Sequence, residues 1–142
     1  MRTELLRQSF AAIGASEGTI WQLDETRAEL VPIWNSGPNA KAFVETYRQP
    51  LSTGLISLVC VTEQALCENE VYRHAGQDPT LDRQLGVLTC AMIAVPLRLR
   101  GETIGVVSCV KLKADPEASD PPPFTAADLA CVQEAVKNLD SE

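Results

Sequence analysis

The chain has 142 residues, of which 45% are hydrophobic and 22% charged, and this composition is typical of a globular domain. Twelve basic against nineteen acidic residues give a net charge of −7, which disfavours nucleic acid or an anionic membrane as a partner. We find no secretory signal and no apolar run of membrane-spanning length, so we expect one cytoplasmic domain over residues 1–142.

The first predicted element is an amphipathic helix over residues 3–14, with Gly14 at its end. Its apolar residues are spaced so that they share one helical face: Leu6, Phe10 and Ile13. Two strand-like segments follow at 18–24 and 29–36, and the short polar turn between them predicts an antiparallel hairpin. Pro32 lacks a backbone donor, so the second strand should lie at a sheet edge or carry a bulge.

The middle of the chain is less regular. Residues 39–53 are consistent with one or two helical turns and a short strand. Ser52 or Thr53 is a candidate cap for a helix over 55–64, although the β-branched residues of that run leave a strand as an alternative. A short extended piece is expected at 65–68.

A second short helix has clear end signals. Asp78 is a good cap, Pro79 suits the first helical position, and Gly86 is typical of a helix end. The two leucines of this helix, Leu81 and Leu85, face the same way. Its charged pair, Asp82 with Arg83, is interpreted as a solvated, ion-paired face.

A final helix follows a proline-rich connector at 114–123. Thr125 and Asp128 resemble a capping box at the start of this helix, which we expect over 125–140. One apolar stripe continues along it: Leu129, Val132, Val136 and Leu139.

The segments 88–99 and 103–112 read as two strands of a hairpin with apolar residues on both faces. Both faces must therefore be covered, which predicts an α+β sandwich: an antiparallel sheet with helices on each side. We expect the terminal helices on one face and the helices of residues 55–86 on the other.

Three stretches together resemble a GAF domain: "GLISLVCVTEQALCENEVY", "DPTLDRQLGVLTCAMIAVPLRLRGETIGVVSCV" and "FTAADLACVQEAV". Each piece is mainly a packing or turn signal, and their order and spacing carry the resemblance. It implies a six-stranded antiparallel sheet in a profilin-like sandwich, with a ligand pocket between one sheet face and the helices of 55–86.

The resemblance also implies a sensory or regulatory module that binds a small ligand and relays the binding through its terminal helices. Homodimerisation through residues 3–14 and 125–140 is expected, although packing on their own sheet uses the same apolar residues. The ligand stays unknown. The signatures of cyclic-nucleotide and bilin binders are absent, and helix starts near Gly54 and Pro79 would favour an anionic group.

Eight residues are candidates for lining the ligand pocket. Three aromatic residues fall where the family lines its cavity, although core packing is an alternative role for them. Thr89 lies on the strand that should form the cavity floor, and its hydroxyl is available either to a ligand or to its own backbone. The full set is Trp34, Tyr47, Ile56, Cys60, Tyr72, Leu85, Thr89 and Met92.

Two alternatives to ligand sensing remain open at this point. One is a ligand-free dimerisation module, and the other is a redox sensor at Cys67, whose neighbouring carboxylates argue against a reactive thiolate. Five scattered cysteines and one histidine give no metal-ligand spacing, and no catalytic constellation is visible, so we expect neither a metal site nor an enzyme. The cysteine set of the methionine-sulfoxide-reducing family members does not align with positions 60, 67 and 90.

Overall fold

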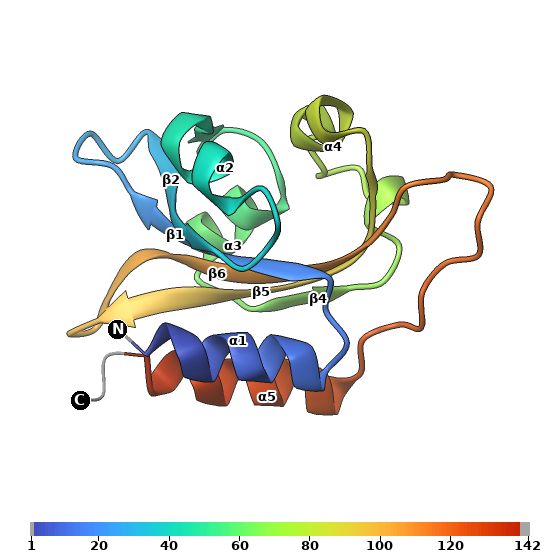
Figure 1. The fold of residues 1–142 in the computed structure, drawn as a ribbon. Helices are drawn as coiled ribbons and strands as arrows, with labels where there is room; N and C mark the ends of the chain where they lie inside the picture. The colour runs from blue at the N-terminus through green and yellow to red at the C-terminus, as the bar shows by residue number, and fades with distance from the viewer. Residues whose placement is uncertain (1, 140–142) are drawn as a thin grey trace.

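The computed structural model describes residues 2–139, so residues 1 and 140–142, including the last position of the helix expected over 125–140, lie outside the description. The described chain forms three layers, with a sheet between two layers of helices (Figure 1). The helices are α1 (Thr3–Ala12), α2 (Ala40–Thr46), α3 (Leu55–Thr62), α4 (Thr80–Leu85) and α5 (Ala126–Lys137), with a short 3₁₀ helix η1 (Val71–Arg73). The strands are β1 (Glu17–Leu23), β2 (Glu29–Asn35), β3 (Gln49–Pro50), β4 (Leu66–Glu68), β5 (Leu88–Leu99) and β6 (Glu102–Lys113).

The sheet has six antiparallel strands in the order β3-β2-β1-β6-β5-β4, so the long β5–β6 hairpin lies centrally. The predicted α+β class, the pairing of the two longest strands and their central place are confirmed. Helices α2, α3 and α4 cover one face, and α1 and α5 cover the other (Figure 1). No helix of the described chain is long and apolar enough to cross a bilayer.

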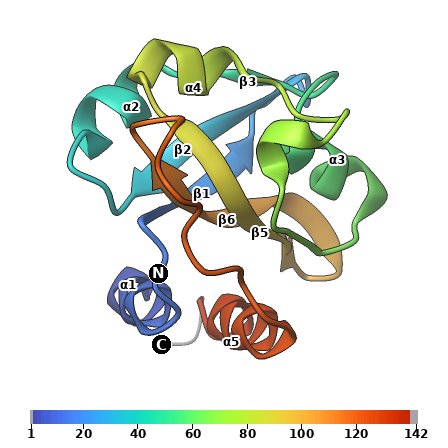
Figure 2. The same cartoon turned by 90° about the vertical axis from the view of Figure 1, so that its right-hand side faces the viewer.

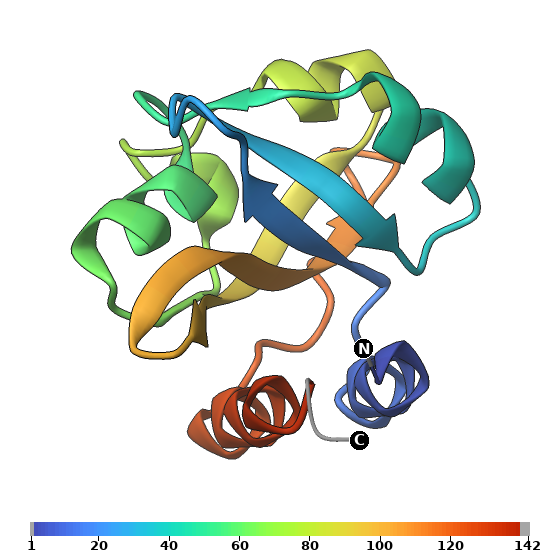
Figure 3. The same ribbon diagram turned by 90° about the vertical axis from the view of Figure 1, so that its left-hand side faces the viewer.

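The sheet face that α1 and α5 cover is closely packed. The two helices lie side by side against the sheet, as the end-on views show (Figures 2 and 3). Leu6 and Phe10 of α1 and Val132 of α5 are at most 2% exposed. Gly18 of β1 permits this approach, because a Cβ there would overlap the Phe10 ring. The first and last described residues also meet, since the Arg2 N–H donates to the Leu139 carbonyl at 2.8 Å.

A bulge in the β1–β2 ladder fixes which side chains face which layer. Ile20 pairs with Trp34, but Trp21 pairs with Pro32, so Ile33 is the extra residue on β2. The edge strand β3 reaches only the first two residues of β2, so Pro32 lies beyond that ladder and beside the bulge. The expectation of a sheet edge or a bulge at this proline is confirmed.

The helix starts were predicted with mixed success. Thr125 and Asp128 form the expected capping box on α5. Gly54 precedes α3 without a side-chain cap, so the predicted cap at Ser52 or Thr53 is wrong. Pro79 precedes α4 as its cap residue, one position later than expected, but Asp78 does accept the Thr80 N–H at 3.0 Å, the hydrogen bond expected of a capping carboxylate.

Candidate functional site

A cavity of about 120 Å³ lies between the sheet and the layer of α2, α3 and α4. Strands β1, β5 and β6 form its floor. Its roof comes from α2, the start of α3, α4 and the segment that leads from η1 to α4. Because each roof helix is only six to eight residues long, none extends across the sheet as α1 and α5 do.

The floor follows from strand alternation. Glu17, Thr19 and Trp21 occupy alternate positions of β1 and line the cavity, and Ser108 of β6 pairs with Thr19. The Trp21 indole N–H donates to the Ser108 hydroxyl at 2.9 Å, which satisfies the only polar atom of a buried tryptophan side chain. Asn35 of β2 completes this edge by donating to Glu17 and Thr19 at 3.0 and 2.9 Å.

The apolar part of the roof is aromatic at one end and aliphatic at the other. Phe43 of α2 meets Trp21 edge-on, with ring centroids 5.5 Å apart and planes at 88°. Ile56 of α3 and two leucines of α4, Leu81 and Leu85, supply the aliphatic part. The cavity therefore offers apolar walls with polar groups at the floor, as small-molecule sites in proteins commonly do.

Polar contacts join the roof segments to one another. The Tyr47 hydroxyl donates to Gln49 at 2.8 Å, and the Gln49 amide donates to Asp78 at 3.2 Å. The Thr53 hydroxyl donates to the same Asp78 carboxylate at 2.8 Å. Hydrogen bonds from Thr80, with further ones from Thr53 and Gln49, lower the pKa of Asp78 to about 2. The loop before α3 is thereby fastened to the start of α4.

Asp82 ties α4 to the floor. Its carboxylate accepts the Thr89 hydroxyl at 2.8 Å and the Thr89 backbone N–H at 2.7 Å. The interpretation of Asp82 as part of a solvated ion-paired face is wrong, because its carboxylate is engaged by Thr89 and forms no ion pair within residues 2–139. The Thr89 hydroxyl, expected to be available to a ligand or its own backbone, is engaged by this carboxylate.

The structure places five of the eight candidate residues at the cavity. Four of them line it: Ile56, Leu85, Thr89 and Met92. Tyr47 lies directly behind the lining, where its ring stacks on Phe43 with centroids 5.4 Å apart. Burial, followed by the fields of Asp78 and Asp82, raises the pKa of Tyr47 to about 12.

Trp34 does not line the cavity. Its pairing with Ile20 turns it to the opposite face, where its ring lies 6.3 Å from that of Phe10 and beneath the Arg7 guanidinium. Trp21 is the tryptophan of the cavity. The alternation of β1 together with a bulge at Pro32 was the signal that could have distinguished the two.

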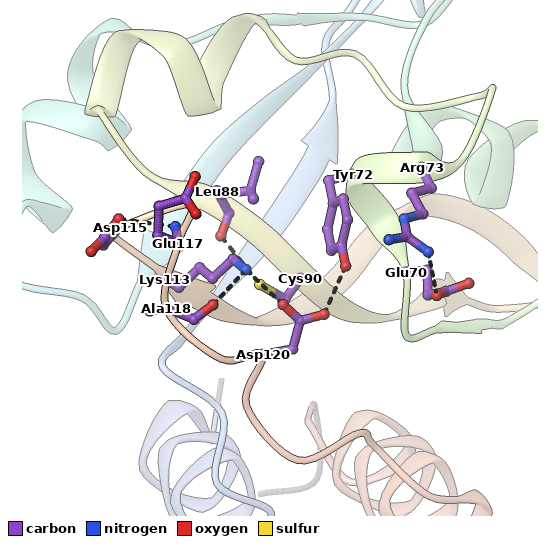
Figure 4. A network of polar contacts seen from close by, with 10 residues as sticks. All are labelled: Glu70, Tyr72, Arg73, Leu88, Cys90, Lys113, Asp115, Glu117, Ala118 and Asp120. Atoms are coloured by element: carbon purple, nitrogen blue, oxygen red, sulfur yellow. Dashed lines mark hydrogen bonds and ion pairs between the residues drawn. The ribbon is translucent and has the colours of Figure 1, made fainter.

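Cys60 and Tyr72 also lie outside the lining. Cys60 packs in the core beneath α3, on the cavity side of the sheet but away from the cavity. Tyr72 of η1 instead contacts the connector, where its hydroxyl donates to Asp120 at 2.7 Å (Figure 4). That hydrogen bond is the main reason that the pKa of Tyr72 is raised.

The connector is fastened along its length rather than loose. Lys113 of β6 donates to Asp120 at 2.7 Å and to the Ala118 carbonyl at 3.0 Å (Figure 4). Lys111, which is 7% exposed, donates to the Pro122 carbonyl at 2.7 Å and lies over the Phe124 ring.

Asn69, which follows β4, completes this attachment. Its amide donates to the Phe124 carbonyl at 3.0 Å and accepts the Phe124 N–H at 2.7 Å. Because Asn69 begins the segment that leads through η1 to the cavity roof, and Phe124 directly precedes the cap of α5, the two layers of helices are joined by hydrogen bonds at the sheet edge.

Five free cysteines are distributed over both sides of the sheet. Cys60 belongs to the core below α3, whereas Cys67 packs against the core below α1 and α5, so the sheet separates the two thiols. Burial is the first cause of a raised pKa at Cys60, at Cys67 and at Cys109, where the pKa reaches about 12. Within residues 2–139 no group of three metal-ligating side chains could hold an ion.

Comparison with known proteins agrees with this fold. The GAF domain family model matches residues 3–139. No curated protein sequence gives a significant match. Solved structures at low identity share the fold. The GAF domain of an Acinetobacter phosphoenolpyruvate-protein phosphotransferase has a TM-score of 0.74 at 19% identity, over 95% of this chain and 74% of that one.

Two further neighbours differ in what they are. The second GAF domain of DevS from Mycobacterium smegmatis has a TM-score of 0.66 at 20% identity, covering 94% of this chain and 87% of that one. A free methionine-R-sulfoxide reductase from Neisseria meningitidis, solved with its substrate, has a TM-score of 0.71 at 21% identity, covering 97% and 74%. GAF domains of two different proteins and an enzyme thus share this architecture. Because the family model matches residues 3–139 and solved GAF domains share the fold, the chain belongs to the GAF domain family.

Proposed function

We propose that this GAF domain is a cytoplasmic ligand sensor and not an enzyme. A small molecule binds in the cavity beneath α2, α3 and α4, and its binding is relayed to the layer of α1 and α5. The observation that carries the proposal is the pair of hydrogen bonds between Asn69 and Phe124, because it joins the segment leading to the cavity roof to the start of α5.

The path from roof to α5 is short. Gln77 and Asp82 of the roof line the cavity. Both belong to the same continuous segment that begins at Asn69 and passes through η1. A ligand that draws the roof toward the floor shifts Asn69 and Tyr72, and these two side chains hold the connector at Phe124 and Asp120. Binding therefore changes the preferred position of the start of α5 relative to the sheet. This is a population shift between two positions of that helix.

Thiol chemistry is disfavoured by the surroundings of the cysteines. A cysteine nucleophile needs a lowered pKa, and the pKa of Cys67 is raised by burial and by Asp128 and Glu68. The reductases among the structural neighbours share the fold with this chain at 18–21% identity, which carries no catalytic residue across to it.

The two tryptophans allow ligand binding to be measured directly. Trp34→Phe leaves Trp21 as the sole tryptophan, at the cavity, and Trp21→Phe leaves Trp34 on the other face. We expect a binding ligand from a screen of amines, carboxylates, nucleotides and neutral metabolites to change the fluorescence of the first variant and raise its thermal midpoint. The second variant serves as the control for signals from outside the cavity. A screen with no response in the first variant contradicts the sensor proposal.

Hydrogen exchange tests the relay. A bound ligand should slow exchange of the amides from Phe124 to Leu129, and Asn69→Ala should abolish that effect while ligand still binds. Asn138→Ala, at the other end of α5, is the matched control, since within residues 2–139 its side chain hydrogen-bonds only to Glu134 of the preceding turn. Equal protection in Asn69→Ala and in the unmodified protein would show that the relay does not pass through this contact.

A ligand-free dimerisation module is the second candidate, favoured by one observation. The apolar stripes of α1 and α5 are buried against their own sheet, but Leu5 on the outer side of α1 is 38% exposed. A homodimer through residues 3–14 and 125–140 would have to use this outer side. Light scattering of Leu5→Glu tests it: a dimer that becomes monomeric supports the interface, and an unchanged mass excludes it.

A further inference from the structure

The charged side chains at the cavity all carry the same sign. Glu17 and Asp82 line the cavity, and the Asp78 carboxylate accepts from Gln49, which lines it too. None of the lining residues that the structure describes is a lysine, arginine or histidine. None of these three carboxylates forms an ion pair with a residue in the described range 2–139. The cavity thus has negative charge without a compensating cation of its own.

Tyr47 reports how this charge acts on a group beside the cavity. Burial, followed by the nearby Asp78 and Asp82 carboxylates, raises the pKa of its hydroxyl to about 12. The two carboxylates therefore oppose the formation of a phenolate behind the lining. The same field opposes the entry of a carboxylate or phosphate and favours a cation, because low-dielectric walls concentrate the potential in a cleft.

The hydrogen-bond donors of the lining are already largely engaged. The Asn35 amide donates to Glu17 and Thr19, and the Gln49 amide donates to Thr53 and Asp78. The Trp21 indole donates to Ser108, and the Thr89 hydroxyl donates to Asp82. The Gln77 amide also donates to Asp82, at 3.4 Å. The Asn39 amide and the hydroxyls of Thr19 and Ser108 remain, and each of these groups can donate or accept and so does not discriminate.

Acceptors, by contrast, are in excess. Glu17 accepts the Asn35 amide through Oε2, and its Oε1 accepts from no side chain or backbone N–H of the described residues. A carboxylate has about four lone-pair sites, so Glu17 and Asp82 can each accept further bonds. A ligand that complements this lining brings donors, and an ammonium group brings three.

Aromatic rings form part of the same wall. Trp21 and Phe43 line the cavity, and Tyr47 stacks behind Phe43. Aromatic rings attract cations through their quadrupole, most strongly where water is excluded. Negative carboxylates, spare acceptors and aromatic rings all select the same class of ligand.

We propose that the cavity binds a small organic cation, a primary ammonium group on a compact apolar body. This inference rests on the proposed ligand-binding function and adds the chemical class of the ligand. The cavity volume of about 120 Å³ limits the apolar body to about the size of one small ring or branched alkyl group. The proposal of a cationic ligand reverses the expectation of an anion at the helix starts. The negative side chains of the lining outweigh the partial positive charge at the starts of such short helices.

A matched set of probes tests the charge class. Benzylamine, benzyl alcohol and benzoate share one ring and differ in charge at pH 7. Each is titrated into Trp34→Phe at constant ionic strength, followed by Trp21 fluorescence and by saturation-transfer NMR. We expect benzylamine to bind at least about tenfold more tightly than benzyl alcohol, and benzoate to bind most weakly.

Charge-removing variants then locate the recognition. Glu17→Gln keeps the size of the side chain and its ability to accept from Asn35, and it should reduce benzylamine affinity toward that of benzyl alcohol. Asp82→Asn should act in the same direction, and its thermal midpoint shows whether the contact with Thr89 survives. Glu45→Gln is the control, because it changes net charge equally on the exposed side of α2.

The outcomes separate the two proposals. If benzyl alcohol or benzoate binds as tightly as benzylamine, the cavity is a binding site but the cationic class is wrong. An equal loss of benzylamine affinity in Glu17→Gln and Glu45→Gln also overturns it, since only the overall charge of the protein would then matter. If none of the three probes binds, the inference fails, and a ligand found in the wider screen would leave the sensor function standing without it.

Discussion

Below the sheet, α1 and α5 close over a core of side chains that are almost wholly buried, whereas above it three short helices leave a cavity lined by polar and aromatic groups. The same strands build both faces. On β1, Gly18 and Ile20 face the long helices, and Glu17, Thr19 and Trp21 face the cavity. Strand alternation thus lets one sheet separate a closely packed face from a face that borders a cavity.

The difference in cover explains the difference in chemistry. A long amphipathic helix such as α5 matches the sheet over several turns and excludes water. The helices of six to eight residues on the other face must be held by polar contacts, such as those of Asp78 and Asp82, because their own apolar area is small. Those contacts bring the carboxylates to the cavity.

The largest expected effect compares the same deletion on the two faces. Leu6→Ala should lower the free energy of unfolding by about 2–5 kcal/mol, because Leu6 is fully buried in a close-packed core. Leu81→Ala should lower it by about 1 kcal/mol, because Leu81 is half-buried and already borders empty volume. Urea unfolding measures both. Equal losses would mean that the cavity face is as tightly packed as the other in solution.

A smaller effect is expected where the cavity floor contains a polar contact. Ser108→Ala removes the acceptor of the buried Trp21 indole N–H and should lower the free energy of unfolding by about 1–3 kcal/mol. In the Trp34→Phe background, the emission of Trp21 should also shift. Ser9→Ala on α1 is a control, since the one hydrogen bond of its hydroxyl in the described chain is to the Leu5 carbonyl one turn earlier. An unchanged stability of Ser108→Ala would indicate that water replaces the hydroxyl.

The smallest effect concerns acid stability of the roof. The pKa of Asp78 is lowered from 3.8 to about 2 by its hydrogen bonds, so its contribution is complete above about pH 4 and is lost as the pH falls toward 2. Asp78→Asn should therefore be less stable at neutral pH and show a shallower loss over that range. Glu25→Gln, in the exposed β1–β2 turn, is the matched control. Parallel urea midpoints for Asp78→Asn and the unmodified protein from pH 4 to 2 would contradict this role.

The closely packed face was the easier half to predict from sequence. The stripe of Leu6 and Phe10 and the capping box at Thr125 are local patterns, and they specify α1 and α5 without knowledge of the rest of the fold. The two neighbouring segments 88–99 and 103–112, with apolar residues on both faces, similarly predicted the pairing of β5 with β6, which the structure confirms.

The cavity was harder, because its lining depends on register and on contacts between distant segments. Trp34 was predicted to line the cavity, but Trp21 does so, because β2 contains one extra residue, Ile33, at its bulge. A shift of one residue turns every following side chain to the other face of the sheet. Asp82 bonds Thr89 seven residues away, and nothing in the local pattern distinguishes that contact from a solvated carboxylate. Phe43 lay in a segment without a clear assignment.

The hydrogen bond between Arg2 and Leu139 brings the two ends of the described chain together at one corner of the fold. A domain with adjacent ends can be inserted into a surface loop of a host protein without prising that loop apart. The same closeness suits circular permutation, with a short peptide across the corner and new ends opened at the exposed stretch around Glu117. Placed inside a fluorescent host, this compact unit would allow the proposed ligand binding to be tested through a change in light output.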